Sequence, residues 1–161
     1  MKVLIVYDSK FGNTEKVAKA MGEAIKDSSE VNVLSVNECS GTALDKVNLL
    51  IVGSPTWAGK PTPTLRKWMQ QLPSKSLSHV YVAGFDTRGD FSTLTSKWLI
   101  KLIQWFGVAA DKILPILIKK GGTPASSPQG FIVMDREGPL KEGELERAHA
   151  CAIEWVKKAQ S

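Results

Sequence analysis

The stretch Ser9-Lys10-Phe11-Gly12-Asn13-Thr14 decides the fold, because it joins an apolar strand to an amphipathic helix near the start of the chain. Residues 2–7 (KVLIVY) form a near-continuous apolar run, which is typical of a parallel strand covered on both faces. From Thr14 to about Lys26, apolar residues recur at the spacing of one helical face. Backbone N–H groups at the start of a helix attract anions, and the hydroxyls and amide of this stretch add polar groups. The stretch therefore predicts a phosphate-binding loop.

Further apolar segments predict an alternation of strands and helices along the rest of the chain. We expect strands at 31–36, 49–53, 79–84 and 113–118, a helical turn near 42–46, and helices around 65–72, 94–106 and 145–156. Such an alternation favours an α/β fold with a doubly wound, five-stranded parallel sheet in the order 2-1-3-4-5, flanked by helices in three layers. Residues 119–130 are irregular. The run 131–133 either resumes the fifth strand after a loop or forms a sixth strand.

Composition limits the class of protein. The 161 residues, 43% of them hydrophobic, predict a single domain spanning 1–161. The net charge is +5, but the Lys and Arg residues are scattered, so we expect no nucleic-acid partner. No apolar run approaches the ~20 residues of a membrane span, so we expect no membrane insertion. The start of the chain does not resemble a signal peptide, and Cys39 and Cys151 are expected to be reduced thiols in a cytoplasmic protein without a metal site.

Two more loops are expected at the same end of the sheet as residues 9–14. One is Ser54–Pro61, which carries Trp57 among Gly and Pro residues; a large aromatic side chain there needs either a flat ligand ring or the following helix to cover it. The other is Phe85–Phe91, in which Arg88 either faces a ligand or pairs with Asp86 or Asp90. In this fold class, ligands bind where such loops meet.

The motif in residues 9–14 distinguishes between phosphate-binding families. The chain lacks both Gly-x-x-x-x-Gly-Lys-Ser/Thr and Gly-x-Gly-x-x-Gly. The pattern Ser-x-x-Gly-Asn-Thr, placed between the first strand and the first helix, resembles the loop with which the flavodoxin family holds the 5′-phosphate of FMN. The alternative is an ordinary turn with Thr14 as the N-cap of the helix. The resemblance extends over essentially the whole chain and includes the Trp-bearing loop.

The resemblance implies a non-covalent FMN and an electron-transfer function with a redox partner protein, as a monomer or weak homodimer. Two alternatives remain: an NAD(P)H- or quinone-dependent FMN oxidoreductase of the same fold, and an interaction module without flavin. The resemblance implies no catalytic side chain. The implied cofactor-binding residues are Ser9, Lys10, Phe11, Gly12, Asn13 and Thr14 for the phosphate, Pro55, Thr56, Trp57, Ala58 and Gly59 for one ring face, and Phe85, Asp86, Thr87, Arg88 and Gly89 for the pyrimidine edge.

Overall fold

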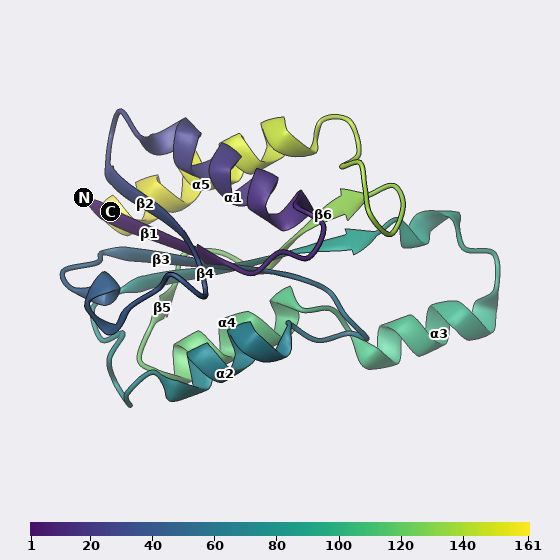
Figure 1. The fold of residues 1–161 in the computed structure, drawn as a ribbon, viewed down its shortest axis with the longest axis horizontal. Helices are drawn as coiled ribbons and strands as arrows, with labels where there is room; N and C mark the ends of the chain where they lie inside the picture. Colours follow the sequence, from purple (N-terminus) through teal and green to yellow (C-terminus); the bar gives the residue numbers. More distant parts are fainter.

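A parallel β-sheet runs through the middle of the molecule, between two layers of helices (Figure 1). The computed structural model describes the backbone of residues 1–161 and every side chain except that of Thr93. The strands lie in the predicted order β2-β1-β3-β4-β5, with β6 also beside β4. Their bounds are β1 Lys2–Tyr7, β2 Glu30–Ser35, β3 Leu49–Pro55, β4 Tyr81–Gly89, β5 Thr123–Pro124 and β6 Gln129–Val133. All the strand pairs are parallel, which confirms the predicted fold class.

The two outer layers cover opposite faces of the sheet. Helices α1 (Asn13–Ile25) and α5 (Glu144–Gln160) lie on one face, and α2 (Pro63–Gln71) and α4 (Ala110–Lys119) lie on the other (Figure 1). Alternate residues of β1 enter the two cores: Val3 and Ile5 pack with α1 and α5, and Leu4 and Val6 pack with α2 and α4. This double burial explains why the strand has an unbroken apolar sequence.

The expectation of a strand at 113–118 is wrong, because these residues belong to α4. Within this run Ile113, Leu114 and Leu117 are buried at helical spacing, while Pro115 lies inside the helix on its exposed side. Proline has no N–H, so the helix lacks one backbone hydrogen bond at this position. A continuous apolar run is compatible with both helix and strand, and tertiary packing decides here.

The fifth position of the sheet is filled by two short strands instead. β5 pairs with Tyr81 and Val82 of β4, and β6 pairs with residues 85–89 of the same strand. Residues 125–128 separate the two. The fifth strand position is therefore interrupted by a loop, as one of the two sequence interpretations proposed. Its first part is Thr123–Pro124, however, and not the expected 113–118.

Strand β4 is longer than predicted, so the expected loop at Phe85–Gly89 is wrong. These residues continue the strand because β3 pairs with them as far as Pro55 and β6 pairs with them on the other side. A 3₁₀ helix at Phe91–Thr93 follows, and then α3 (Lys97–Phe106). Helix α3 does not cover the sheet but projects beyond the carboxyl ends of the strands (Figure 1). A second 3₁₀ helix lies at Gly41–Leu44, near the predicted helical turn.

Candidate functional site

The loop between β1 and α1 presents unengaged backbone donors. Helix α1 begins at Asn13, and its N-cap is Gly12 with φ 84°, so the alternative interpretation with Thr14 as the N-cap is wrong. The Ser9 hydroxyl accepts a hydrogen bond from the Glu15 amide at 3.4 Å. Among the described hydrogen bonds, none is donated by the backbone amides of residues 10–14. These amides and the positive end of the α1 dipole form an anion-binding arrangement.

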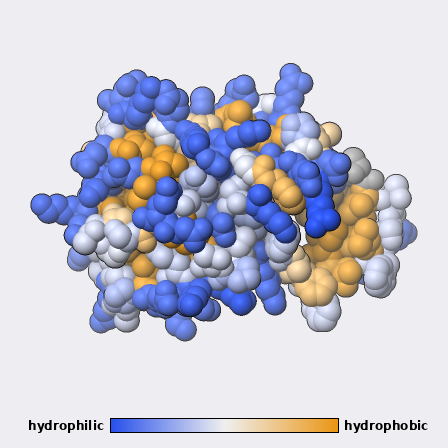
Figure 2. Space-filling view, in the orientation of Figure 1, coloured by the Kyte–Doolittle hydropathy of each residue, from blue (hydrophilic) through white to orange (hydrophobic). Residues whose placement is uncertain are grey.

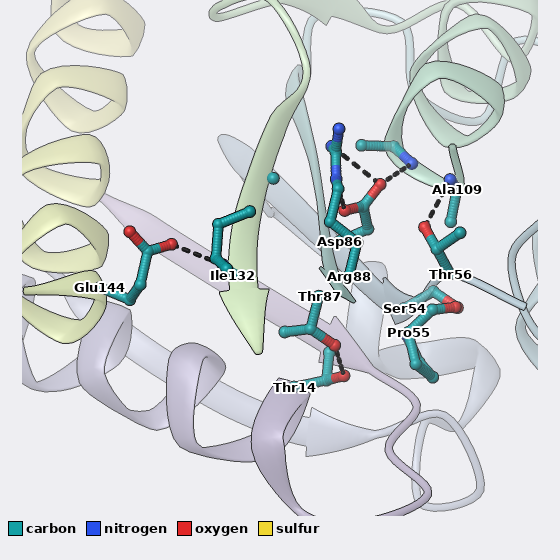
Figure 3. Close-up of polar contacts among 12 residues, drawn as sticks. Thr14, Ser54, Pro55, Thr56, Asp86, Thr87, Arg88, Ala109, Ile132 and Glu144 are labelled. Carbon is teal, nitrogen blue, oxygen red and sulfur yellow. Dashed lines mark hydrogen bonds and ion pairs between the residues drawn. The ribbon is translucent and has the colours of Figure 1, made fainter. Parts of the chain in front are cut away.

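Side chains of this loop connect it to the neighbouring segments. The Thr14 and Thr87 hydroxyl oxygens lie 2.8 Å apart, so α1 and β4 share a buried hydrogen bond (Figure 3). The Asn13 amide donates to the Glu137 carbonyl at 3.0 Å. The Thr62 hydroxyl donates to the Asp8 carboxylate at 2.5 Å and joins the loop to the start of α2. The loop is held on three sides before any ligand arrives.

Residues Trp57–Lys60 form a tight turn at the end of β3. Trp57 and Lys60 exchange two backbone hydrogen bonds of 2.9 Å, and the central residues Ala58 and Gly59 both have positive φ, 45° and 73°. This geometry is that of a type I′ turn, which favours Gly at both central positions. A Cβ on Gly59 would lie 2.4 Å from the Phe106 carbonyl oxygen, so only glycine fits there.

Contacts from α4 hold this turn in place. The Lys112 ammonium donates to the Gly59 carbonyl at 2.6 Å and to the Phe106 carbonyl at 2.7 Å. The Thr56 hydroxyl accepts from the Ala109 amide at 2.9 Å, at the first turn of α4 (Figure 3). Together these bonds fix the turn that carries Trp57.

The Trp57 ring is 46% exposed, so the alternative in which it folds onto the next helix does not describe this structure. The Lys10 ammonium lies 3.6 Å from the ring centroid, a cation–π contact between the first loop and the turn. Trp57 borders more than one hollow, including the large pocket described below. Both Trp57 and Lys10 line this pocket, so its wall carries an aromatic ring next to a cation.

The residues expected at the pyrimidine edge fall into two groups. Phe85 is fully buried: its ring fills the space above Gly53, where a Cβ would lie 2.0 Å from a ring carbon, and it meets Phe131 edge-on at 5.9 Å. Asp86 is also fully buried and does not line the pocket. Thr87, Arg88 and Gly89 do line it.

Arg88 is held by Asp86, as one of the two sequence interpretations proposed. The Arg88 guanidinium donates to both carboxylate oxygens, at 2.6 and 3.1 Å, and the Ala110 amide donates to the same carboxylate at 2.9 Å (Figure 3). Burial raises the pKa of the Asp86 carboxyl, while the Arg88 charge and the Ala110 hydrogen bond act in the opposite direction. The guanidinium also lies against Gly130, where a Cβ would be 2.1 Å from one of its nitrogens. The Arg88 charge is therefore largely balanced within the protein.

These segments surround a pocket of about 450 Å³ at the carboxyl ends of the strands. This volume lies within the range of small-molecule and cofactor sites. It brings together most of the residues predicted from the sequence, and Gly12, Ala58, Gly59, Phe85 and Asp86 are not among its lining residues. The predicted residues that line it are Ser9, Lys10, Phe11, Asn13, Thr14, Pro55, Thr56, Trp57, Thr87, Arg88 and Gly89.

The sequence interpretation missed two walls of this pocket. One comes from the segment after β4 and from α3, and the other is the turn after β6. Their sequences carry no ligand-binding motif, and β6 itself was not assigned with certainty from the sequence. Asp90 and Phe91 end the loop that was expected at Phe85–Phe91, and the added residues are Leu94, Leu99, Ile103, Val133, Met134, Asp135 and Arg136.

Metal chemistry finds no support in the described part of the chain. Within it, no group of three or more His, Cys, Asp and Glu side chains is placed to hold a metal ion. In the same part, no helix has both the length and the apolar character needed to cross a bilayer. Cys39 and Cys151 are free thiols, as expected.

Comparison with known proteins places this geometry in a family. A family profile described as "Flavodoxin domain" matches residues 4–126. A protein named "Flavodoxin" from Clostridium saccharobutylicum is 27% identical over 153 residues, covering 92% of this chain and 91% of that protein.

Solved structures show the same fold. Oxidised flavodoxin 2 from Bacillus cereus has a TM-score of 0.71 at 22% identity, with 98% of this chain and 99% of that chain covered. The rubredoxin oxygen:oxidoreductase of Desulfovibrio gigas has a TM-score of 0.74 at 20% identity over 99% of this chain. The chain spans only 36% of that larger protein, so the likeness concerns one part of it.

Proposed function

This chain belongs to the flavodoxin family of flavin-binding electron-transfer proteins, and from that premise we propose that its pocket binds FMN and that it passes electrons to a partner protein. The observation that carries the proposal is the set of unengaged backbone amides at residues 10–14, at the N-terminus of α1. Several converging N–H donors on a helix N-terminus suit a phosphate monoester, which FMN has and riboflavin lacks.

The pocket supports a flat ring next to this phosphate site. Trp57 forms one wall, and the apolar side chains of Leu94, Leu99 and Ile103 form another. These walls would cover the ring and exclude water, which strengthens polar contacts inside the pocket. Bound FMN would supply one- and two-electron transfer, and the protein would tune that chemistry by its surroundings.

Individual residues of the chain have definable roles toward such a ligand. The Thr14–Thr87 hydroxyl pair has one proton that is not used between the two oxygens, and it can donate that proton to an anion at the loop. Lys10 adds a positive charge beside the same loop. The Asp86–Arg88 pair and the flanking strands fix the end of β4, which holds Thr87, Arg88 and Gly89 in the pocket wall.

The same proposal includes the setting in which the protein works. We propose a cytoplasmic domain spanning 1–161 that is a monomer or a weak homodimer and binds no nucleic acid. The free thiols and the scattered cations support this proposal. Sedimentation at several protein concentrations tests the oligomeric state.

Titration of the apoprotein with FMN and with riboflavin tests the phosphate assignment. Two charge-assisted hydrogen bonds at about 1.5 kcal/mol each predict that FMN binds roughly 100-fold more tightly than riboflavin. Thr14→Val should weaken FMN binding and leave riboflavin binding unchanged. Lys16→Met, in an exposed side chain on the same helix, is the matched control and should leave both unchanged. Equal affinities for the two flavins would reject the phosphate assignment, and no binding of either would reject the function.

Trp57→Ala tests the ring position in the same assay. Loss of a stacked aromatic wall should cost on the order of 1–2 kcal/mol of FMN affinity and remove much of the tryptophan quenching on binding. Trp98→Ala is the control, because Trp98 does not line the pocket. A Trp57→Ala variant with wild-type affinity and quenching would contradict the stacking.

A further inference from the structure

Helix α3 exposes an aromatic surface beside the flavin pocket. The Trp98 side chain is 71% exposed and that of Trp105 is 82% exposed. They are seven residues apart, so they lie on the same helical face. In the space-filling view orange, aliphatic-rich surface gathers where α3 projects from the body, whereas tryptophan is pale on this hydropathy scale (Figure 2). Large exposed apolar patches of this kind mark interaction sites.

The opposite side of α3 continues the pocket itself. Leu99 and Ile103 line the flavin pocket, and Leu102 and Phe106 face a hollow of about 270 Å³ between α3 and the Trp57 turn. One helix therefore forms the wall of the pocket on one side and presents Trp98 and Trp105 on the other. A protein that docks on α3 therefore lies next to a wall of the pocket.

The surroundings of this helix carry positive charge. Lys97 and Lys101 are exposed on α3, and Lys60 and Arg66 line a groove of about 440 Å³ next to Trp57. In the part of the chain that the structure describes, none of these four side chains is in an ion pair. Asp111 and Arg66 line the same neighbouring groove. One carboxylate does not balance the four cations, so positive charge remains in excess. Complementary charge steers association and selects partners.

We infer that this surface docks an acidic redox protein, whose carboxylates meet the cations while an apolar area covers the two tryptophans. We call it the α3 face: Trp98, Trp105, Lys97 and Lys101, all exposed on α3. The inference rests on the proposed electron-transfer function and adds the chemistry of the partner. A second copy of the chain would bring the same cations together and be repelled. A buried Trp ringed by charges is the usual form of an interface hot spot.

Two haem proteins of opposite charge serve as probes. We expect the soluble domain of cytochrome b5, which is acidic, to bind the FMN-loaded protein, with an affinity that falls steeply as salt rises. Cytochrome c, which is basic, should not bind. Binding of cytochrome c with equal or higher affinity would overturn the inference.

Substitutions on the α3 face are the second test of the inference. Trp98→Ala with Trp105→Ala should weaken cytochrome b5 binding about tenfold or more, as for interface hot spots. Lys97→Glu with Lys101→Glu should weaken it by a similar factor and flatten its salt dependence. The matched controls are Lys157→Glu with Lys158→Glu and the exposed Ile153→Ala, all on α5, and they should change little. Equal effects of face and control variants would overturn the inference.

Electron transfer is measured with the same set. The loaded protein is reduced with dithionite, the excess is removed, and each fully reduced flavin passes one electron to each of two ferric haems. The rate to cytochrome b5 should fall in the face variants while the flavin absorbance and FMN affinity stay unchanged.

Three other results would indicate a different binding partner for the α3 face or would refute the proposed function. Vesicles of phosphatidylcholine and phosphatidylserine that capture the protein through Trp98 and Trp105, with no cytochrome b5 binding, would overturn the inference in favour of a lipid surface. A dimer that Trp105→Ala dissociates would overturn it in favour of a second copy. A protein that binds cytochrome b5 but no flavin would refute the proposed function and leave the acidic-partner surface standing.

Discussion

Replacement of Lys112 by Met should loosen the turn that carries Trp57. The Lys112 ammonium is the donor to both the Gly59 and Phe106 carbonyls, at 2.6 and 2.7 Å, and so connects α4 to the turn and to the end of α3. Methionine keeps a similar length and apolar stem but donates no hydrogen bond. The change therefore removes the connection without creating a large cavity.

The magnitude follows from three contributions. Two hydrogen bonds from a charged donor contribute about 3 kcal/mol together, taken at the low end because the side chain is half exposed. Release of the ordered lysine side chain returns about 1 kcal/mol, and removal of a cation from the first turn of a helix returns about 0.5 kcal/mol. The net loss of unfolding free energy is thus roughly 1–1.5 kcal/mol. Because a loosened turn is competent for binding only part of the time, FMN affinity should fall about fivefold.

Urea unfolding of the apoprotein and FMN titration measure the two effects. Lys119→Met is the matched control: Lys119 is exposed on the same helix and makes none of the described hydrogen bonds. The reasoning is refuted if Lys112→Met and Lys119→Met have the same unfolding midpoint and the same FMN affinity.

Three further outcomes follow from the geometry. Gly53→Ala should cost roughly 1–3 kcal/mol in urea unfolding, because its Cβ would overlap the Phe85 ring; a wild-type midpoint would contradict this packing. Ala58→Gly should raise the unfolding free energy by up to about 1 kcal/mol, since Ala58 has φ 45°; a lower midpoint would contradict the strain. The Asp90 carboxyl accepts from Ser92 and Lys141, which lowers its pKa to about 2. The stability from these bonds is present above the unfolded pKa and is lost as pH falls through 2, and an NMR titration midpoint near 4 would contradict them.

The fold could be predicted from the sequence where burial leaves a pattern. Residues 2–7 and 49–55 are apolar because both faces of their strands are covered, and α1 and α5 show one apolar side each. Residues 113–118 could not be assigned in this way, because a short apolar run fits either element. β5 has only two residues and is defined by its neighbour β4, which no local pattern predicts.

The site shows the same division. The loop at 9–14 and the Trp57 turn follow directly from their residue types, since donors, Gly and an exposed Trp have few other uses at a strand end. Residues 85–89 were expected in a loop because the apolar run of the fourth strand was taken to end at residue 84. They continue the strand because each charge is balanced by the other and by the Ala110 amide. The α3 wall depends on how a distant helix is placed, so it had no signal in its own sequence.

The hydroxyl pair of Thr14 and Thr87 has a consequence for the chemistry of recognition. Either hydroxyl can donate to the other, so the hydrogen bond has two possible directions. In each of them the proton of the accepting hydroxyl is free to point elsewhere. An anion at the loop would attract that proton and select one of the two orientations. Since Thr87 belongs to β4, the choice made at the helix terminus is transmitted to the strand through a single proton. Binding of an anion at the loop would therefore fix the direction of a hydrogen bond that reaches into the sheet.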